Sequence, residues 1–259
     1  MTGVTDAAEA VSVLADPTPG FLTGSAVTTL VYIFGIKVLL RGLTWEGVIS
    51  SWLLGALTYS AFGAGGFVIV CLYFLIGSKV TKIKLEQKQK EGIAEARSGR
   101  RGLGSVLGSG FAGAACALLA LLTGNVDLWR VGFAASFASK LADTTSSEIG
   151  KAYGKTTYLI TSLERVPRGT EGAVSLEGTL AGLAAAAFTA GIAVPLQQVS
   201  WAGALCVVVA AFVANIAESY LGAVAQSRVD WLSNDVVNIL QITLAAGLGV
   251  GLAQLIGAV

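Results

Sequence analysis

Long apolar segments, repeated along most of the chain, restrict its fold more than any other feature. Eight stretches are rich in Ala, Leu, Val, Gly and Phe: Phe21–Leu40, Gly47–Phe62, Gly66–Ile76, Leu103–Thr123, Leu128–Ala142, Ala173–Val194, Trp201–Leu221 and Val236–Val259. A helix of about 20 apolar residues crosses the hydrocarbon of a bilayer. Inside hydrocarbon, helices satisfy their own backbone hydrogen bonds. The sequence therefore predicts an all-α, polytopic transmembrane helical bundle.

The composition supports a bundle embedded in lipid. Of the 259 residues, 54% are hydrophobic and 13% are charged, whereas a soluble domain carries about 25% charged residues. The 33 glycines suit helix packing in lipid, because small residues let two backbones approach closely. We expect an N-terminal tail over residues 1–20 and a single transmembrane catalytic domain over residues 21–259.

The number of crossings depends on the second and third apolar stretches. Both are short, and they meet at the Gly-rich turn of residues 62–66. They could form a tight hairpin, a re-entrant pair or two tilted spans. The fifth stretch, Leu128–Ala142, is also short. We therefore expect seven or eight crossings.

The basic residues indicate an orientation. If the loop after Ile76 lies inside, every Lys and Arg except Arg130 falls on the inside face. The positive-inside rule predicts such an asymmetry. Losing one crossing would scatter the charges, so this pattern favours eight spans with both termini outside. The net charge of +1 provides no strong field for nucleic acid, and we expect no nucleic-acid partner.

Polar residues concentrate on the same face. A basic loop over residues 78–102 contains Arg100 and Arg101 between glycines, and guanidinium groups bind phosphate oxygens in pairs. A polar loop over residues 143–172 follows the fifth span. At its start, Ser139, Asp143 and Ser147 share one helical face. An Asp at the bilayer centre costs about 2.5–3.5 kcal/mol on insertion scales, so this group predicts a polar cavity.

Two further groups extend the predicted site. Glu177 lies about one turn inside an apolar helix, where an acid usually has a function, and Gly169 and Gly172 precede it. Asn215, Glu218 and Ser219 end the seventh span, and Asn234, Asp235 and Asn238 begin the last one.

The available side chains limit the chemistry. The chain has no His, and Cys71, Cys116 and Cys206 stand in apolar runs without metal-ligand spacing. Carboxylates and amides suit Mg²⁺, which is commonly held by one or two carboxylates together with substrate phosphates. Phosphoryl transfer depends mainly on positioning and electrostatics. A transporter, whose polar residues line a pathway near mid-membrane, would use the same side chains.

Several motifs resemble one membrane protein family. They are residues 77–81, 92–102, 139–156, 166–179 and 231–238, and the resemblance covers about residues 42–259. This family contains the integral-membrane phytyl-phosphate kinases of plants and cyanobacteria, and it is distantly similar to polyprenol kinases and lipid cytidylyltransferases. The resemblance implies phosphorylation of phytyl phosphate to the diphosphate by CTP or another nucleoside triphosphate. It also implies a role in tocopherol (vitamin E) synthesis from chlorophyll-derived phytol.

The same resemblance implies a location and a cofactor. We expect a plastid envelope, thylakoid or cyanobacterial membrane, with the active face on the stromal or cytoplasmic side, and we expect Mg²⁺ as the cofactor. The partners would be the isoprenoid phosphate, the nucleotide and membrane lipid. A lipid-phosphate cytidylyltransferase and a transporter without chemistry remain the alternatives.

The expected site residues follow from these motifs. The catalytic candidates are Asp143, Lys155 and Arg168, and the metal candidates are Asp143, Glu148, Glu218 and Asp235. The remaining candidates would bind substrate or nucleotide: Lys79, Arg100, Arg101, Lys140, Ser147, Gly150, Gly154, Arg165, Gly169, Thr170, Glu171, Gly172, Glu177, Asn215, Ser219, Asn234 and Asn238.

Overall fold

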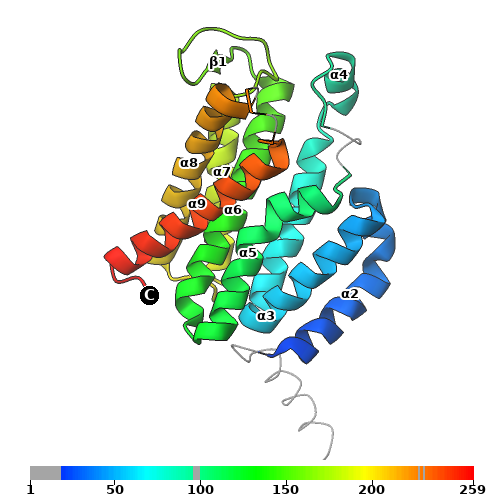
Figure 1. Ribbon diagram of the computed structural model, residues 1–259, viewed down its shortest axis with the longest axis vertical. Coiled ribbons are helices and arrows are strands. Elements are labelled where there is room, and N and C mark those ends of the chain that lie inside the picture. Colours follow the sequence, from blue (N-terminus) through cyan, green and yellow to red (C-terminus); the bar gives the residue numbers. More distant parts are fainter. Residues whose placement is uncertain (1–18, 96–99, 227, 230) are drawn as a thin grey trace, which may run out of the picture.

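A computed structural model describes residues 19–95, 100–226, 228–229 and 231–259. Most of the expected tail 1–20 and residues 96–99 of the basic loop lie outside this range. The helices are α2 (Phe21–Gly42), α3 (Trp45–Thr81), α4 (Leu85–Lys90), α5 (Leu103–Thr123), α6 (Val126–Tyr153), α7 (Leu176–Ala193), α8 (Trp201–Leu221) and α9 (Asn234–Leu255). A π-helical turn, Gly222–Gln226, follows α8. The described chain is nearly all helical, as predicted (Figure 1).

Helix α6 forms the centre of the bundle. It packs against α3, α5, α7, α8 and α9, and its residues from Val131 to Ala142 are all buried. The rings of Phe133 and Phe137 pack at a tilt of 56°, with their centroids 5.0 Å apart. Phe62 and Tyr73 of α3 pack against these two rings. The core is therefore aromatic where α3 meets α6, and most of its other buried residues are small, with alanine the commonest.

Helix α3 folds back on itself at Gly63. This residue has φ 65° inside the long helix, a conformation that glycine adopts without a steric penalty. The rings of Tyr59 and Phe67 are 5.9 Å apart, although eight residues of straight helix would separate them by about 12 Å. The second and third apolar stretches thus form the hairpin, which was one of the three expected alternatives.

Six helices of the described chain are long and apolar enough to cross a membrane: α2, α3, α5, α7, α8 with its π-helical turn, and α9. The two parts of α3, before and after Gly63, are counted here as one helix. The fifth expected span lies in α6, which is not among the six because of its polar and charged residues. It packs against five other helices. All eight apolar stretches are thus helical for most of their length, and the number of crossings stays a prediction.

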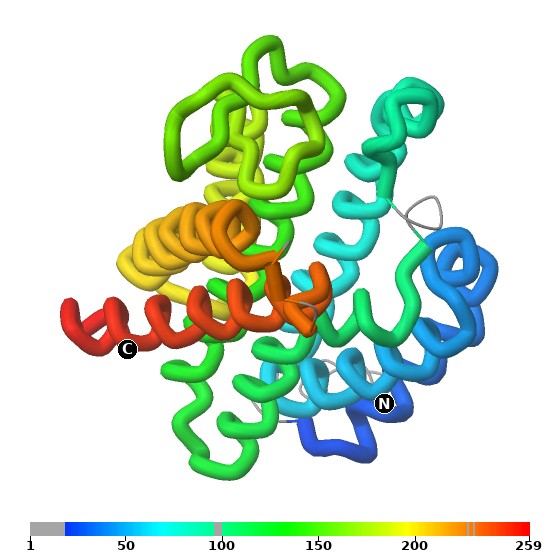
Figure 2. Tube along the Cα trace, turned by 45° about the horizontal axis from the view of Figure 1, so that its top comes forward, coloured from blue at the N-terminus to red at the C-terminus, as the bar shows by residue number. Residues whose placement is uncertain are grey.

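Both expected loops begin later than predicted. Residues 143–153 of the polar loop continue α6, and the basic loop contains the end of α3 and all of α4. The extra turns of α6 pack closely on α7, where a β-carbon at Gly178 would lie 3.3 Å from Gly150 Cα. Within the rest of the polar loop, β1 (Tyr158–Leu159) pairs antiparallel with β2 (Ala173–Val174), which follows the loop directly, and Tyr158 lies opposite Val174. The tube view in Figure 2 shows this loop above the ends of α7 and α8.

Candidate functional site

A polar cavity of about 570 Å³ opens at one end of the bundle, within the usual range for ligand sites of about 300–1,000 Å³. It is lined by the ends of α3 and α8, the polar end of α6, the starts of α5, α7 and α9, and the two long loops. Most predicted site residues line it: Arg100, Arg101, Lys140, Asp143, Ser147, Glu148, Gly150, Gly169, Thr170, Glu171, Gly172, Asn215, Glu218, Ser219, Asn234, Asp235 and Asn238.

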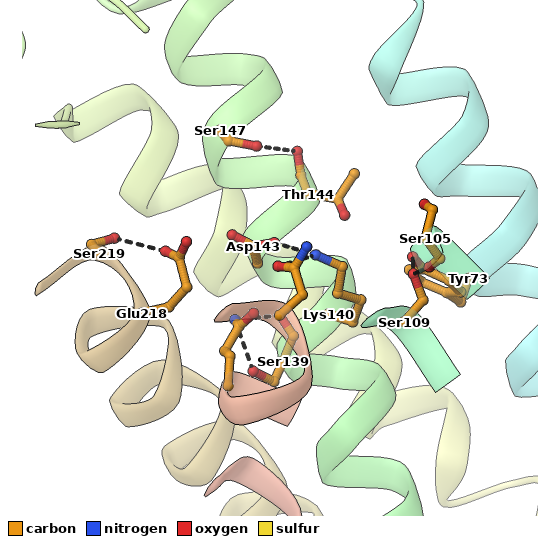
Figure 3. Close-up of polar contacts among 12 residues, drawn as sticks. Tyr73, Ser105, Ser109, Ser139, Lys140, Asp143, Thr144, Ser147, Glu218 and Ser219 are labelled. Carbon is orange, nitrogen blue, oxygen red and sulfur yellow. Dashed lines mark hydrogen bonds and ion pairs between the residues drawn. The ribbon is translucent and has the colours of Figure 1, made fainter. Parts of the chain in front are cut away.

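Lys140 lies at the centre of the site. Its ammonium donates to Asp143 Oδ2 at 2.6 Å and to Asn238 Oδ1 at 2.7 Å. Lys140 and Asn238 are almost completely buried, and the Asp143 side chain is 14% exposed. A buried charge is stable only when it is paired and hydrogen-bonded. These three side chains therefore join α6 and α9 through charge-assisted hydrogen bonds (Figure 3).

A second carboxylate faces the first across the cavity. Glu218 of α8 lines the same cavity as Asp143, and Figure 3 shows its side chain directed toward α6. The hydroxyl of Ser219 donates to Glu218 at 3.3 Å. Two facing carboxylates with amide oxygens nearby fit Mg²⁺, which needs one or two protein carboxylates when substrate phosphates complete its ligands. Within the described ranges, no cluster of three or more acidic or Cys side chains could hold a metal alone.

Two arginines enter the cavity from the basic loop, and their positions are held by the main chain. Arg101 donates its backbone N–H to Gly42, and its carbonyl accepts from Thr44. Its guanidinium lies over the Tyr73 ring, 4.7 Å from the ring centroid. Arg100 donates to the Leu43 carbonyl at 3.0 Å. Cation–π and backbone contacts of this kind hold the positive groups at the rim of the cavity.

Three helices begin at the cavity. Ser175 caps α7 by accepting from Gly178 N, and Ser233 caps α9 by accepting from Val236 N. Gly102 precedes the first residue of α5 and provides no side-chain cap. Backbone N–H groups at helix starts favour anions. The cavity is thus lined by basic side chains and by the positive ends of helix dipoles, together with carboxylates that include Asp143, Glu218 and Asp235.

Asp235 depends on a glycine for its place. It belongs to the first turn of α9, and a β-carbon at Gly104 would collide with its Oδ2 atom. The missing side chain at Gly104 lets this carboxylate lie directly against the start of α5.

Other predicted residues are held elsewhere. Glu148 lines the cavity, but its carboxylate forms a buried ion pair with Lys88 of α4, so a metal would have to compete with that ammonium, as it would with Lys140 at Asp143. Arg168 pairs with Glu91 at 3.0 Å, half-exposed. The backbone N–H of Lys155 donates to Glu177 at 3.4 Å. Arg168 and Lys155 are absent from the cavity walls as far as the structure describes them, and so are Lys79, Gly154, Arg165 and Glu177.

Sequence reasoning missed several lining residues. Tyr73 lies in an apolar run and resembles a core aromatic, yet its hydroxyl donates to Ser109 at 2.7 Å at the edge of the cavity. Below the site, Gln241 of α9 donates to Ser139 Oγ at 3.1 Å. A polar residue inside an apolar run is the signal that points to Ser109 and Gln241.

Apolar helices around one buried, charged helix, with a polar cavity at one end, define a polytopic integral membrane protein with an internal polar site. The chain belongs to the DUF92 family of integral membrane proteins, whose family model matches residues 27–246. The resemblance to a membrane family with plant and cyanobacterial members is thereby confirmed.

Three relatives cover most of the chain. Protein VTE6, chloroplastic, of Arabidopsis thaliana is 45% identical over 96% of this chain and 76% of its own length. The membrane protein sll0875 of Synechocystis is 47% identical over 83% of this chain and 85% of its own. The membrane protein MJ0933 of Methanocaldococcus jannaschii is 32% identical over 81% of this chain and 85% of its own. No solved structure matches the chain.

Proposed function

We propose that this protein is a prenyl-phosphate kinase that transfers the γ-phosphoryl group of a nucleoside triphosphate to an isoprenoid monophosphate. The polar cavity is the observation that carries the proposal. It combines the cations Arg100, Arg101 and Lys140 with the facing carboxylates of Asp143 and Glu218. The similarity to a chloroplastic and a cyanobacterial protein makes phytyl phosphate the first substrate to test and CTP the first nucleotide.

The proposed reaction needs little covalent help from the protein. An oxygen of the prenyl phosphate bonds to the γ-phosphorus, and the bond from that phosphorus to the β–γ bridging oxygen breaks. The nucleoside diphosphate leaves with the electron pair. Since the acceptor is already an anion, no side chain has to remove a proton. The protein supplies positioning and charge stabilisation.

Each group then has a role. Arg100 and Arg101 bind the triphosphate at the rim, with the start of α5 beside them. Lys140 neutralises negative charge at the transferring group. Asp143 and Glu218, with Asp235 as a third candidate, would hold Mg²⁺, which stabilises charge on the phosphate oxygens. The cavity would face the stromal or cytoplasmic side, where the nucleotide is available.

The test uses purified protein in lipid nanodiscs with labelled CTP, Mg²⁺ and phytyl phosphate. The proposal predicts equal amounts of CDP and phytyl diphosphate, and a lower rate when Mg²⁺ is removed. Pyrophosphate together with a CDP-lipid would identify a cytidylyltransferase instead. Substrate flux across sealed vesicles without nucleotide consumption would identify a transporter. Geranylgeranyl and farnesyl phosphates, run in parallel, would rank the prenyl chains.

A further inference from the structure

An apolar groove lies beside the polar cavity, between α6, α7 and α8. Its volume is about 210 Å³, and its apolar walls include Ala142, Gly182, Leu183, Ala186, Phe212 and Ile216. The same groove and the polar cavity are both lined by Ser146, Thr179, Asn215 and Ser219. A molecule with a polar head and an apolar tail could therefore occupy both spaces at once.

The groove opens on a surface that suits lipid. Leu183, Phe212 and Ile216 are 39%, 39% and 44% exposed, although all three are large and apolar. They belong to α7 and α8, which are both long and apolar enough to span a membrane. In a bilayer, this side of the groove would face hydrocarbon, so an apolar chain could enter it sideways.

The junction between groove and cavity contains a polar group without a partner. Asn215 lines both spaces, and its Nδ2 atom is buried without a hydrogen-bond partner in the part of the chain that the structure covers. A buried amide donor is normally hydrogen-bonded. A phosphate oxygen at the junction would accept from it, close to Lys140 and Glu218.

We infer that the groove between α7 and α8 binds the first isoprenoid units of the lipid substrate, with its phosphate held at Asn215. This inference rests on the proposed function and assigns the lipid subsite of the same site. A site of 210 Å³ is smaller than the usual ligand pocket, so the rest of the chain lies in the bilayer. The protein should therefore select for the structure of the chain near the phosphate and tolerate different chain lengths.

A second apolar pocket fits this role less well. It lies between α2, α3 and α5, reaches Arg101 and Tyr73, and has a volume of about 90 Å³. Its hydroxyl groups already have partners, because Tyr32 donates to Ser51 and Tyr73 donates to Ser109. It is smaller, and the hydroxyls of these two pairs are already used within the protein.

Photo-crosslinking tests the location without requiring turnover. The probe is phytyl phosphate carrying a diazirine in the first isoprene unit, added to the protein in nanodiscs. We expect labelling of Leu183, Phe212 or Ile216, reduced by excess phytyl phosphate and much less by phytol. Labelling of Leu39 or Val70, at the second pocket, would overturn the inference. Labelling of the groove that phytyl phosphate fails to reduce would identify bulk membrane lipid as its occupant and would also overturn it.

Two variants sharpen the test. Leu183→Trp narrows the groove, and it should raise the KM for phytyl phosphate about tenfold, since misfit in an apolar pocket changes substrate preference 10–200-fold. The KM for the nucleotide should not change. Leu205→Trp is the control, because Leu205 is 62% exposed on α8 and does not line the groove. An equal effect of both variants on KM would contradict the inference.

Asn215→Leu tests the phosphate contact. It should abolish the advantage of phytyl phosphate over phytol in the crosslinking competition, while the probe still labels the groove. An unchanged advantage would refute the role of Asn215. If the protein shows no kinase activity but competed labelling persists in the groove, the proposed function fails and the lipid subsite stands. If the protein is an active kinase but the probe labels residues outside the groove, the proposed function stands and the lipid subsite is wrong.

Discussion

The ammonium of Lys140 lies 2.6 Å from the carboxylate of Asp143, three residues further along α6. The same helix carries a second pair with the same spacing, Asp127 with Arg130 at 2.9 Å. The surroundings of the two pairs differ. Asp143 is 14% exposed at the polar cavity, whereas Asp127 is 80% exposed at the other end of the helix. This difference allows matched experiments on one helix.

Asp143→Asn should lower kcat by at least about 100-fold, because it removes charge from the proposed Mg²⁺ site while keeping the size of the side chain. Asp127→Asn should leave kcat unchanged. Turnover of labelled CTP measures both variants, and gel filtration in detergent checks that they fold. Normal turnover by a folded Asp143→Asn protein would remove Asp143 from the mechanism.

Glu148 was expected to bind metal, and the structure pairs it with Lys88. If that pair is structural, Glu148→Gln should release α4 from α6, because breaking a buried ion pair costs roughly 3–5 kcal/mol. We expect faster proteolysis of the loop around residues 82–95, with little change in the Mg²⁺ dependence of turnover.

The double variant Lys88→Met with Glu148→Gln provides the control, since it leaves neither charge unpaired. It should recover much of the protease resistance. A large increase in the Mg²⁺ requirement of Glu148→Gln, with the loop still protected, would instead support the metal role.

Gly104→Ala should weaken the binding of the Mg²⁺–nucleotide complex, because the added methyl group collides with the Asp235 carboxylate. Gly251→Ala is the matched control, since nothing lies within 4 Å of its position on α9. Alanine also favours a helix over glycine by about 1 kcal/mol, so the control should be at least as stable as the parent protein. Nucleotide titration by calorimetry measures both. Equal affinities would mean that the position of Asp235 is unimportant for nucleotide binding.

Arg101→Lys should raise the KM for the nucleotide about tenfold, because lysine lacks the planar fork that binds two phosphate oxygens. Arg168→Lys should change it less than about threefold, since a half-exposed ion pair contributes about 0–1 kcal/mol. Steady-state kinetics with varied CTP decides between them. A larger effect at Arg168 would return that residue to the catalytic role expected from its motif.

The helices were predictable because hydropathy is a local property of the chain. The apolar run from Leu103 to Thr123 became α5 with the same boundaries, since lipid or other helices can bury such a run whatever its neighbours are. The end of α6 was misjudged because the apolar signal stops near Ala142, while the helix continues to Tyr153 by packing on α7. The Gly-rich turn of residues 62–66 showed where α3 would bend. It did not show which of the three expected conformations the two apolar stretches would adopt.

The candidate site was also predictable only in part. By itself, the sequence determined a membrane bundle, the gathering of charge and polar residues at one set of helix ends, and many of the residues that line the cavity. Only the tertiary structure decided which of these groups meet. Lys140 pairs with Asn238, 98 residues away, and Lys88 with Glu148, 60 residues away. Such pairs depend on how distant helices pack, and the energy of a buried charge depends on its distance to a partner, which local composition does not encode.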